Sequence, residues 1–80
     1  RALAFTLGAP GTAADLHVMA NLYWAPLPMA APDLPGRAWR RAIDTARTAP
    51  EDITPRGAAC TLRDGRIAVA GRSVVVLLSA

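Results

Sequence analysis

The sequence predicts an all-β domain, an antiparallel β-sandwich of about five to seven short strands in a Greek-key-like arrangement. Two observations predict this fold. Apolar residues alternate with more polar ones in several short runs, the period-two pattern of strands. Glycine and proline, with 6 and 7 residues in a chain of 80, separate these runs and favour turns. Because so short a chain has room for one core, we expect a single domain over residues 1–80.

The first two runs predict a hairpin. Residues 2–7 alternate, which predicts a half-buried strand with Leu3, Phe5 and Leu7 on one face. Residues 15–24 form the clearest strand of the first half. One of its faces carries Leu16, Val18, Ala20, Leu22 and Trp24, and the other carries Asp15, His17, Met19, Asn21 and Tyr23. The Gly-Ala-Pro-Gly loop at residues 8–11 joins the two strands.

The middle of the chain is less regular. Residues 26–36 contain four prolines, so any strand there is short or lies at an edge. Residues 37–49 leave two alternatives open. Trp39, Ile43 and Ala46 have helical spacing, whereas the surrounding strands favour a strand over residues 39–44. Residues 50–55, bounded by two prolines, predict a loop.

The last third predicts three strands. Asp64-Gly65 lies between apolar runs at residues 59–63 and 66–70, which predicts a hairpin with a type I′ turn. Gly71-Arg72 then breaks the ladder. Residues 73–78 form a final strand in which polar alternation is absent, so we expect both of its faces to be covered.

The sequence offers no catalytic or metal-binding constellation. His17 is the sole histidine and belongs to the less apolar face of its strand, which favours a surface or interface position. Cys60, the sole cysteine, is expected to be a small buried hydrophobe. The carboxylates are scattered and suit caps or turns: Asp33, Asp44, Glu51, Asp52 and Asp64. We therefore expect no catalytic residue, no cofactor and no metal in this chain.

Charge and hydropathy argue against two classes of partner. The net charge is +3 and every basic residue is arginine, but only Arg37, Arg40 and Arg41 cluster and no aromatic-and-basic strand motif accompanies them, so no nucleic-acid partner is expected. The apolar run at residues 74–78 is far shorter than a membrane span. One cysteine favours a cytoplasmic protein. Both ends of the chain look like cuts from a longer protein.

The aromatic residues are the best candidates for contacts. Tyr23 and Trp24 are neighbours, so on a strand one enters the core with Leu16 and Leu22 while the other faces outward. We expect a docking surface first, a second small cluster under the proline-rich segment next, and a sugar-stacking platform last. The candidate contact residues, for domain docking or for α-glucan, are Tyr23, Trp24, Trp39 and Met19.

The order of the segments carries a family resemblance. The strand at residues 16–24 and a proline-bearing segment are followed by Trp-Arg-Arg-Ala-Ile-Asp-Thr-Ala at 39–46, Ala-Pro-Glu-Asp-Ile at 49–53 and Gly-Arg-Ser-Val-Val-Val-Leu at 71–77. This series, which covers nearly the whole chain, resembles the carboxy-terminal domain of bacterial glycogen debranching enzymes of the isoamylase type, within the α-amylase superfamily.

The resemblance implies a β-sandwich that follows a catalytic (β/α)-barrel and packs against it. The parent enzyme would hydrolyse α-1,6 branch linkages of glycogen, with its catalytic carboxylates in the barrel and none in this chain. Asn21, Trp39 and Asp44-Thr45 would be structural positions. Arg41 departs from the apolar residue that the pattern would place there. The alternative function is an independent carbohydrate-binding module that recognises α-glucan through exposed aromatics.

Overall fold

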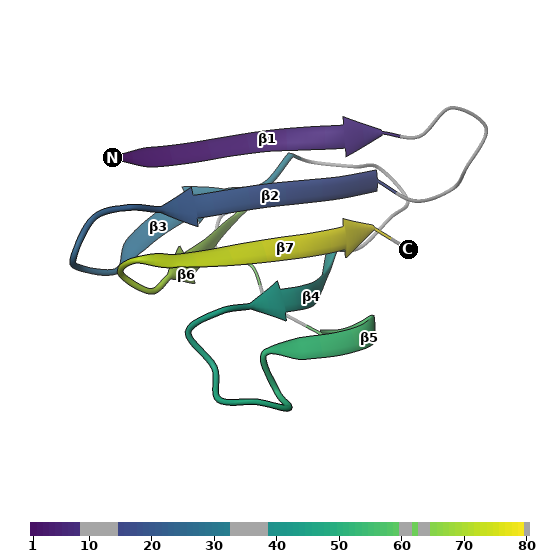
Figure 1. Cartoon of the computed structure of the whole chain (residues 1–80). Helices are drawn as coiled ribbons and strands as arrows, with labels where there is room; N and C mark the ends of the chain where they lie inside the picture. Colours follow the sequence, from purple (N-terminus) through teal and green to yellow (C-terminus); the bar gives the residue numbers. More distant parts are fainter. Residues whose placement is uncertain (9–14, 33–38, 60–61, 63–64, 80) are drawn as a thin grey trace.

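A computed structural model describes the backbone of residues 1–8, 15–32, 39–59, 62 and 65–79, and the side chains of the same residues except 55–59. The described residues form seven strands: β1 (Ala2–Gly8), β2 (Asp15–Asn21), β3 (Leu27–Ala30), β4 (Trp39–Asp44), β5 (Ile53–Ala59), β6 (Arg66–Val69) and β7 (Ser73–Ser79). They form a five-stranded sheet of order β1-β2-β7-β4-β5 and a two-stranded sheet of β3 and β6 (Figure 1). All pairings are antiparallel, which confirms the predicted fold class.

The predicted first hairpin is present, with a different burial. β1 and β2 pair in one register from Ala2↔Asn21 to Gly8↔Asp15. However, every residue of β1 is exposed, so the prediction of a half-buried first strand is wrong. The cause is its position, since β1 is the edge of the large sheet and extends past the small sheet that covers the inner face (Figure 1).

The final strand, β7, is the centre of the large sheet, between β2 and β4. Its burial alternates perfectly although its sequence does not. Ser73, Val75, Leu77 and Ser79 are buried, and the residues between them are half-buried. The expectation that both faces are covered therefore holds for the inner face only, because the described part of the small sheet lies against that face.

β4 resolves the two alternatives for residues 37–49 in favour of a strand over Trp39–Asp44. A bulge interrupts the strand between Arg41 and Ile43. Trp39 and Arg41 pair with the inward-facing residues Ser79 and Leu77, whereas Ile43 pairs with outward-facing Val76. The extra residue of the bulge thus turns Ile43 to the opposite face of the sheet. The predicted loop at residues 50–55 ends earlier than expected, because β5 begins at Ile53.

The small sheet has a strand pairing that the sequence did not predict. β6 pairs with β3, from Leu27↔Val69 to Ala30↔Arg66, and Ala59 pairs with Arg40 of β4. The predicted partner strand at residues 59–63 lies mostly outside the described residues, so the second hairpin stays a prediction. Gly65 does have the positive φ that the Asp-Gly turn requires, 72°, and its carbonyl accepts a hydrogen bond from the Ala31 amide. Cys60 and Asp64 lie outside the described residues.

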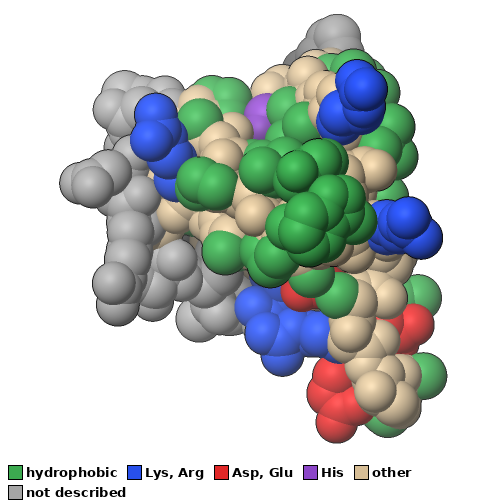
Figure 2. All heavy atoms as spheres, turned by 90° about the vertical axis from the view of Figure 1, so that its left-hand side faces the viewer, with side chains coloured by type: hydrophobic (Ala, Val, Ile, Leu, Met, Phe, Trp, Pro, Cys, Tyr) green, Lys and Arg blue, Asp and Glu red, His purple; other side chains and the backbone are tan. Residues whose placement is uncertain are grey.

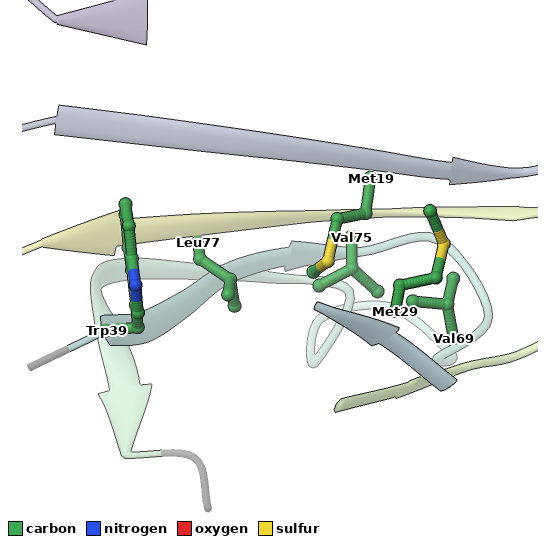
Figure 3. Close-up of a cluster of buried hydrophobic side chains, with 6 residues drawn as sticks. All are labelled: Met19, Met29, Trp39, Val69, Val75 and Leu77. Carbon is green, nitrogen blue, oxygen red and sulfur yellow. The ribbon is translucent and has the colours of Figure 1, made fainter. Parts of the chain in front are cut away.

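The core lies between the two sheets. The large sheet contributes Met19, Trp39, Val75 and Leu77, and the small sheet contributes Met29 and Val69, with their side chains pointing toward one another (Figure 3). The burial of β2 reverses the expected orientation: the face with His17, Met19 and Asn21 is buried, whereas Leu16 and Leu22 are exposed. Among the described residues no helix is long and apolar enough to cross a membrane.

Candidate docking surface

The face of the large sheet that is turned away from the small sheet is apolar across three neighbouring strands, β1, β2 and β7. The register places Leu3 beside Ala20, Phe5 beside Val18 and Leu7 beside Leu16, and the same residues of β2 then pair with β7. We call this surface the outer face: Leu3, Phe5, Leu7, Leu16, Val18, Ala20, Val74, Val76 and Leu78. The first four are exposed and the other five are half-buried.

One row of the outer face crosses the whole sheet. Phe5 pairs with Val18, Val18 with Val76, Val76 with Ile43, and Ile43 with Ile53. Ile53 of the far edge strand is itself exposed. The row depends on the β4 bulge, because without that extra residue Ile43 would point inward. A structural irregularity thus completes an apolar row that no described element covers.

The dimensions of the outer face exceed those of scattered surface hydrophobics. Five strands at about 4.8 Å spacing span roughly 19 Å, and the four residue steps from Leu3 to Leu7 span roughly 14 Å. The outward-facing positions of β1, β2 and β7 that form the outer face carry no ionisable side chain. Arg40 of β4 pairs with Leu78 and flanks the outer face there. A contiguous apolar patch on this scale is often functional, and larger patches mark interaction sites.

A second exposed apolar feature lies where β2 ends. Leu22, Tyr23 and Trp24, which we call the aromatic corner, are all exposed, Trp24 to 71%. The two aromatic rings lie 5.3 Å apart between centroids, with 42° between their planes. Figure 2 views this end of the molecule and shows a central patch of hydrophobic side chains with arginine side chains at its margins.

The aromatic corner is held by a buried amide. Asn21 accepts a hydrogen bond at Oδ1 from the Tyr23 amide at 2.9 Å, and its Nδ2 donates to the Ala25 carbonyl at 2.9 Å. The Tyr23 carbonyl accepts from the Arg72 amide at 2.9 Å. Gly71 packs so closely that a Cβ there would lie against the Trp24 carbonyl group. The turn is therefore fixed from both sides, and the exposed rings project from a rigid base.

The structure separates the four residues predicted to make contacts. Tyr23 and Trp24 lie on the surface, at the aromatic corner. Met19 and Trp39 lie in the core with exposures of 0% and 7%, so their assignment to a contact surface is wrong. Trp39 also donates from Nε1 to the Pro32 carbonyl at 2.8 Å. The prediction of contact residues missed those of the outer face. The sequence feature that could have identified them is the apolar run at residues 74–78, from which we expected a strand covered on both faces.

His17 is a structural residue. Its Nε2 donates to the Ala30 carbonyl at 3.1 Å, and its Nδ1 shares a hydrogen bond of 2.8 Å with the Thr6 hydroxyl. The ring also contacts Trp39, with 5.8 Å between centroids. His17 is buried, which corrects the expectation of a surface position. Within the described ranges, no three side chains of His, Cys, Asp or Glu gather to hold a metal ion.

No protein-family model matches this chain, and no curated protein matches it.

Proposed function

We propose that this chain is a non-catalytic carboxy-terminal domain of a glycogen debranching enzyme of the isoamylase type, which stabilises the catalytic barrel of its parent chain by packing the outer face against it. The parent enzyme is a cytoplasmic glycoside hydrolase that cleaves α-1,6 branch linkages during glycogen breakdown. The parent enzyme binds α-glucan at its catalytic barrel.

The observation that carries this proposal is the outer face. An apolar row runs from Phe5 to Ile53 across the five strands of the large sheet. The opposite face of this sheet packs against the core. A broad and largely apolar surface suits the helical exterior of a larger domain, since apolar burial contributes about 25 cal/mol per Å² without directional requirements. The segment order that resembles the debranching family supports the identity of that domain.

The first test concerns the parent chain. The coding sequence that precedes Arg1 is expected to encode a barrel with paired carboxylates, and the 80-residue chain alone is expected to leave branched glucan intact. Debranching by a pure sample of this chain would overturn the proposal, as would an upstream sequence without a glycosidase domain.

The second test concerns the outer face. Leu16→Lys and Ile53→Lys change exposed apolar side chains. In the parent enzyme we expect either variant to lower the melting temperature of the barrel and the rate of branch cleavage, whereas in the isolated chain both should fold as before. Ala68→Lys, which alters an exposed apolar residue of the small sheet, is the matched control. Equal behaviour of all three variants in the parent would contradict the proposal.

The aromatic corner favours a second candidate function, an α-glucan-binding module. Trp24 is the most exposed large hydrophobic among the described residues, and Tyr23 lies beside it on a fixed turn. Rigid aromatic surfaces of this kind bind sugar rings through their apolar faces. Titration of maltooligosaccharides, followed by the indole signals of Trp24 and the buried Trp39, distinguishes the two functions: saturable shifts confined to Trp24 favour glucan binding.

A further inference from the structure

The two edges of the large sheet are protected to different degrees. β5 contains Pro55 and Arg56, two residue types that discourage pairing at an edge. β1 has the sequence Ala-Leu-Ala-Phe-Thr-Leu-Gly, with no charge and no proline, and all seven residues are exposed. Figure 1 shows β1 as the upper edge of the sheet, and no described strand pairs with its outer side.

The pattern of hydrogen bonds identifies the open groups of β1. The Arg1 carbonyl accepts a bond from the Leu22 amide at 2.7 Å, so the backbone polar groups of Arg1 point toward β2. Because such groups alternate in direction along an antiparallel strand, those of Leu3, Phe5 and Leu7 also point toward β2. The amide and carbonyl groups of the intervening residues therefore point outward from the edge: Ala2, Ala4, Thr6 and Gly8.

The open edge is complementary to itself. In an antiparallel pair of two β1 strands centred on Phe5, Ala2 of one copy faces Gly8 of the other and Ala4 faces Thr6. These pairs contain only residues whose polar groups point outward, so they form about eight hydrogen bonds along the whole strand. Phe5 then faces Phe5, and Leu3 faces Leu7, at the closer, non-hydrogen-bonded positions where side chains contact best.

We propose that β1 is a self-association edge, through which two copies of this chain form a two-fold symmetric dimer with a continuous ten-stranded sheet. The strand carries no charge between Ala2 and Gly8, and the symmetry places Arg1 of the two copies at opposite ends, so like charges stay apart. The two outer faces lie on the same side and join through the Leu3, Phe5 and Leu7 rows. One edge contact of this size is smaller than a standard interface, so the dimer is weak and forms in the micromolar to millimolar range.

A charge exchange at the two-fold axis tests the register. Phe5→Lys places two ammonium groups opposite each other, and Phe5→Glu places two carboxylates there, so we expect each variant alone to sediment as a monomer. An equal mixture of the two variants should recover the dimer. The double variant Leu3→Lys/Leu7→Glu should also remain dimeric by itself, because each introduced lysine faces an introduced glutamate of the other copy.

Sedimentation velocity of the 80-residue chain over that concentration range gives the result, with circular dichroism to show that every variant is folded. Ile53→Lys, at the opposite edge of the sheet, is the control and should leave the dimer unchanged. A monomer at all concentrations, a dimer that survives Phe5→Lys, or a mixture that fails to associate would each overturn the proposal. Loss of the dimer in Ile53→Lys would also overturn it, because the outer face rather than the edge would then hold the copies together.

Discussion

The side chain of Asn21 donates a hydrogen bond from Nδ2 to the carbonyl oxygen of Val69, 3.0 Å away, and thereby joins the large sheet to the small one. Nδ2 also lies 2.9 Å from the Ala25 carbonyl and 3.2 Å from the Ala70 carbonyl. Asn21 is completely buried. A buried amide in contact with carbonyls on three sides connects the two sheets and the aromatic corner at one point. The Ala70 carbonyl also accepts a hydrogen bond from the Ser73 hydroxyl at 2.6 Å.

We predict that Asn21→Asp is at least as destabilising as Asn21→Ala, although aspartate has nearly the same shape. A carboxylate has no proton to donate at neutral pH and would face three carbonyl oxygens. We expect Asn21→Ala to lower the free energy of unfolding by about 3 kcal/mol and Asn21→Asp by about 4 kcal/mol. Urea denaturation measures both values, and an aspartate variant as stable as the unmodified chain would contradict this account.

His17 gives a second test of buried polar contacts. His17→Phe keeps a ring beside Trp39 but loses the bonds to Ala30 and Thr6, so we expect stability to fall by about 1–2 kcal/mol. Thr6→Val removes one of these bonds and should cost less, about 0.5–1 kcal/mol. In the His17→Phe background, Thr6→Val should cost nearly nothing, because the bond is already lost. Additive effects of the two substitutions would show that this bond does not contribute.

Gly71 and Gly65 make a matched pair for the rigidity of the aromatic corner. A Cβ at Gly71 would lie 2.6 Å from the Trp24 carbonyl carbon and 3.0 Å from the Ala25 amide nitrogen, so backbone must move. Gly71→Ala should therefore destabilise the chain and shift the fluorescence of Trp24. Gly65 has positive φ with no atom near its absent Cβ, so Gly65→Ala should cost only about 1 kcal/mol of strain and leave that fluorescence unchanged. Equal fluorescence shifts in both variants would contradict the close packing at Gly71.

The sequence predicted strands more reliably than it predicted their faces and partners. Alternation located β1 and β2, and the Gly-Pro-Gly loop indicated their pairing. The buried face of β2 was predicted wrongly because Leu16 looks more apolar than His17, yet His17 is buried with both ring nitrogens hydrogen-bonded. Hydropathy alone cannot distinguish a leucine that packs in the core from a leucine that stays exposed on the surface. The long-range pairing of β6 with β3 likewise has no signal in the local sequence.

Of the candidate site, the sequence predicted an exposed apolar surface but only some of the residues that form it. The outer face depends on register across β1, β2 and β7, and on the bulge that turns Ile43 outward, neither of which local patterns encode. Tyr23 and Trp24 were identified because two adjacent aromatics on a strand cannot both be buried on one face. Both nevertheless lie on the surface, because the strand ends at Asn21 and the chain turns there.

Val75 and Val76 test the distinction between the two faces of β7 with identical chemistry. Val75 is 1% exposed and packs in the core between the sheets, whereas Val76 belongs to the outer face and is half-buried. We expect Val75→Ala to lower the free energy of unfolding by about 2 kcal/mol, from lost burial and a cavity, and Val76→Ala by less than about 1 kcal/mol. Both substitutions reduce strand propensity equally, so the difference isolates burial. Urea denaturation of the isolated chain provides the measurement, and a larger loss for Val76→Ala would mean that the outer face is already covered within this chain.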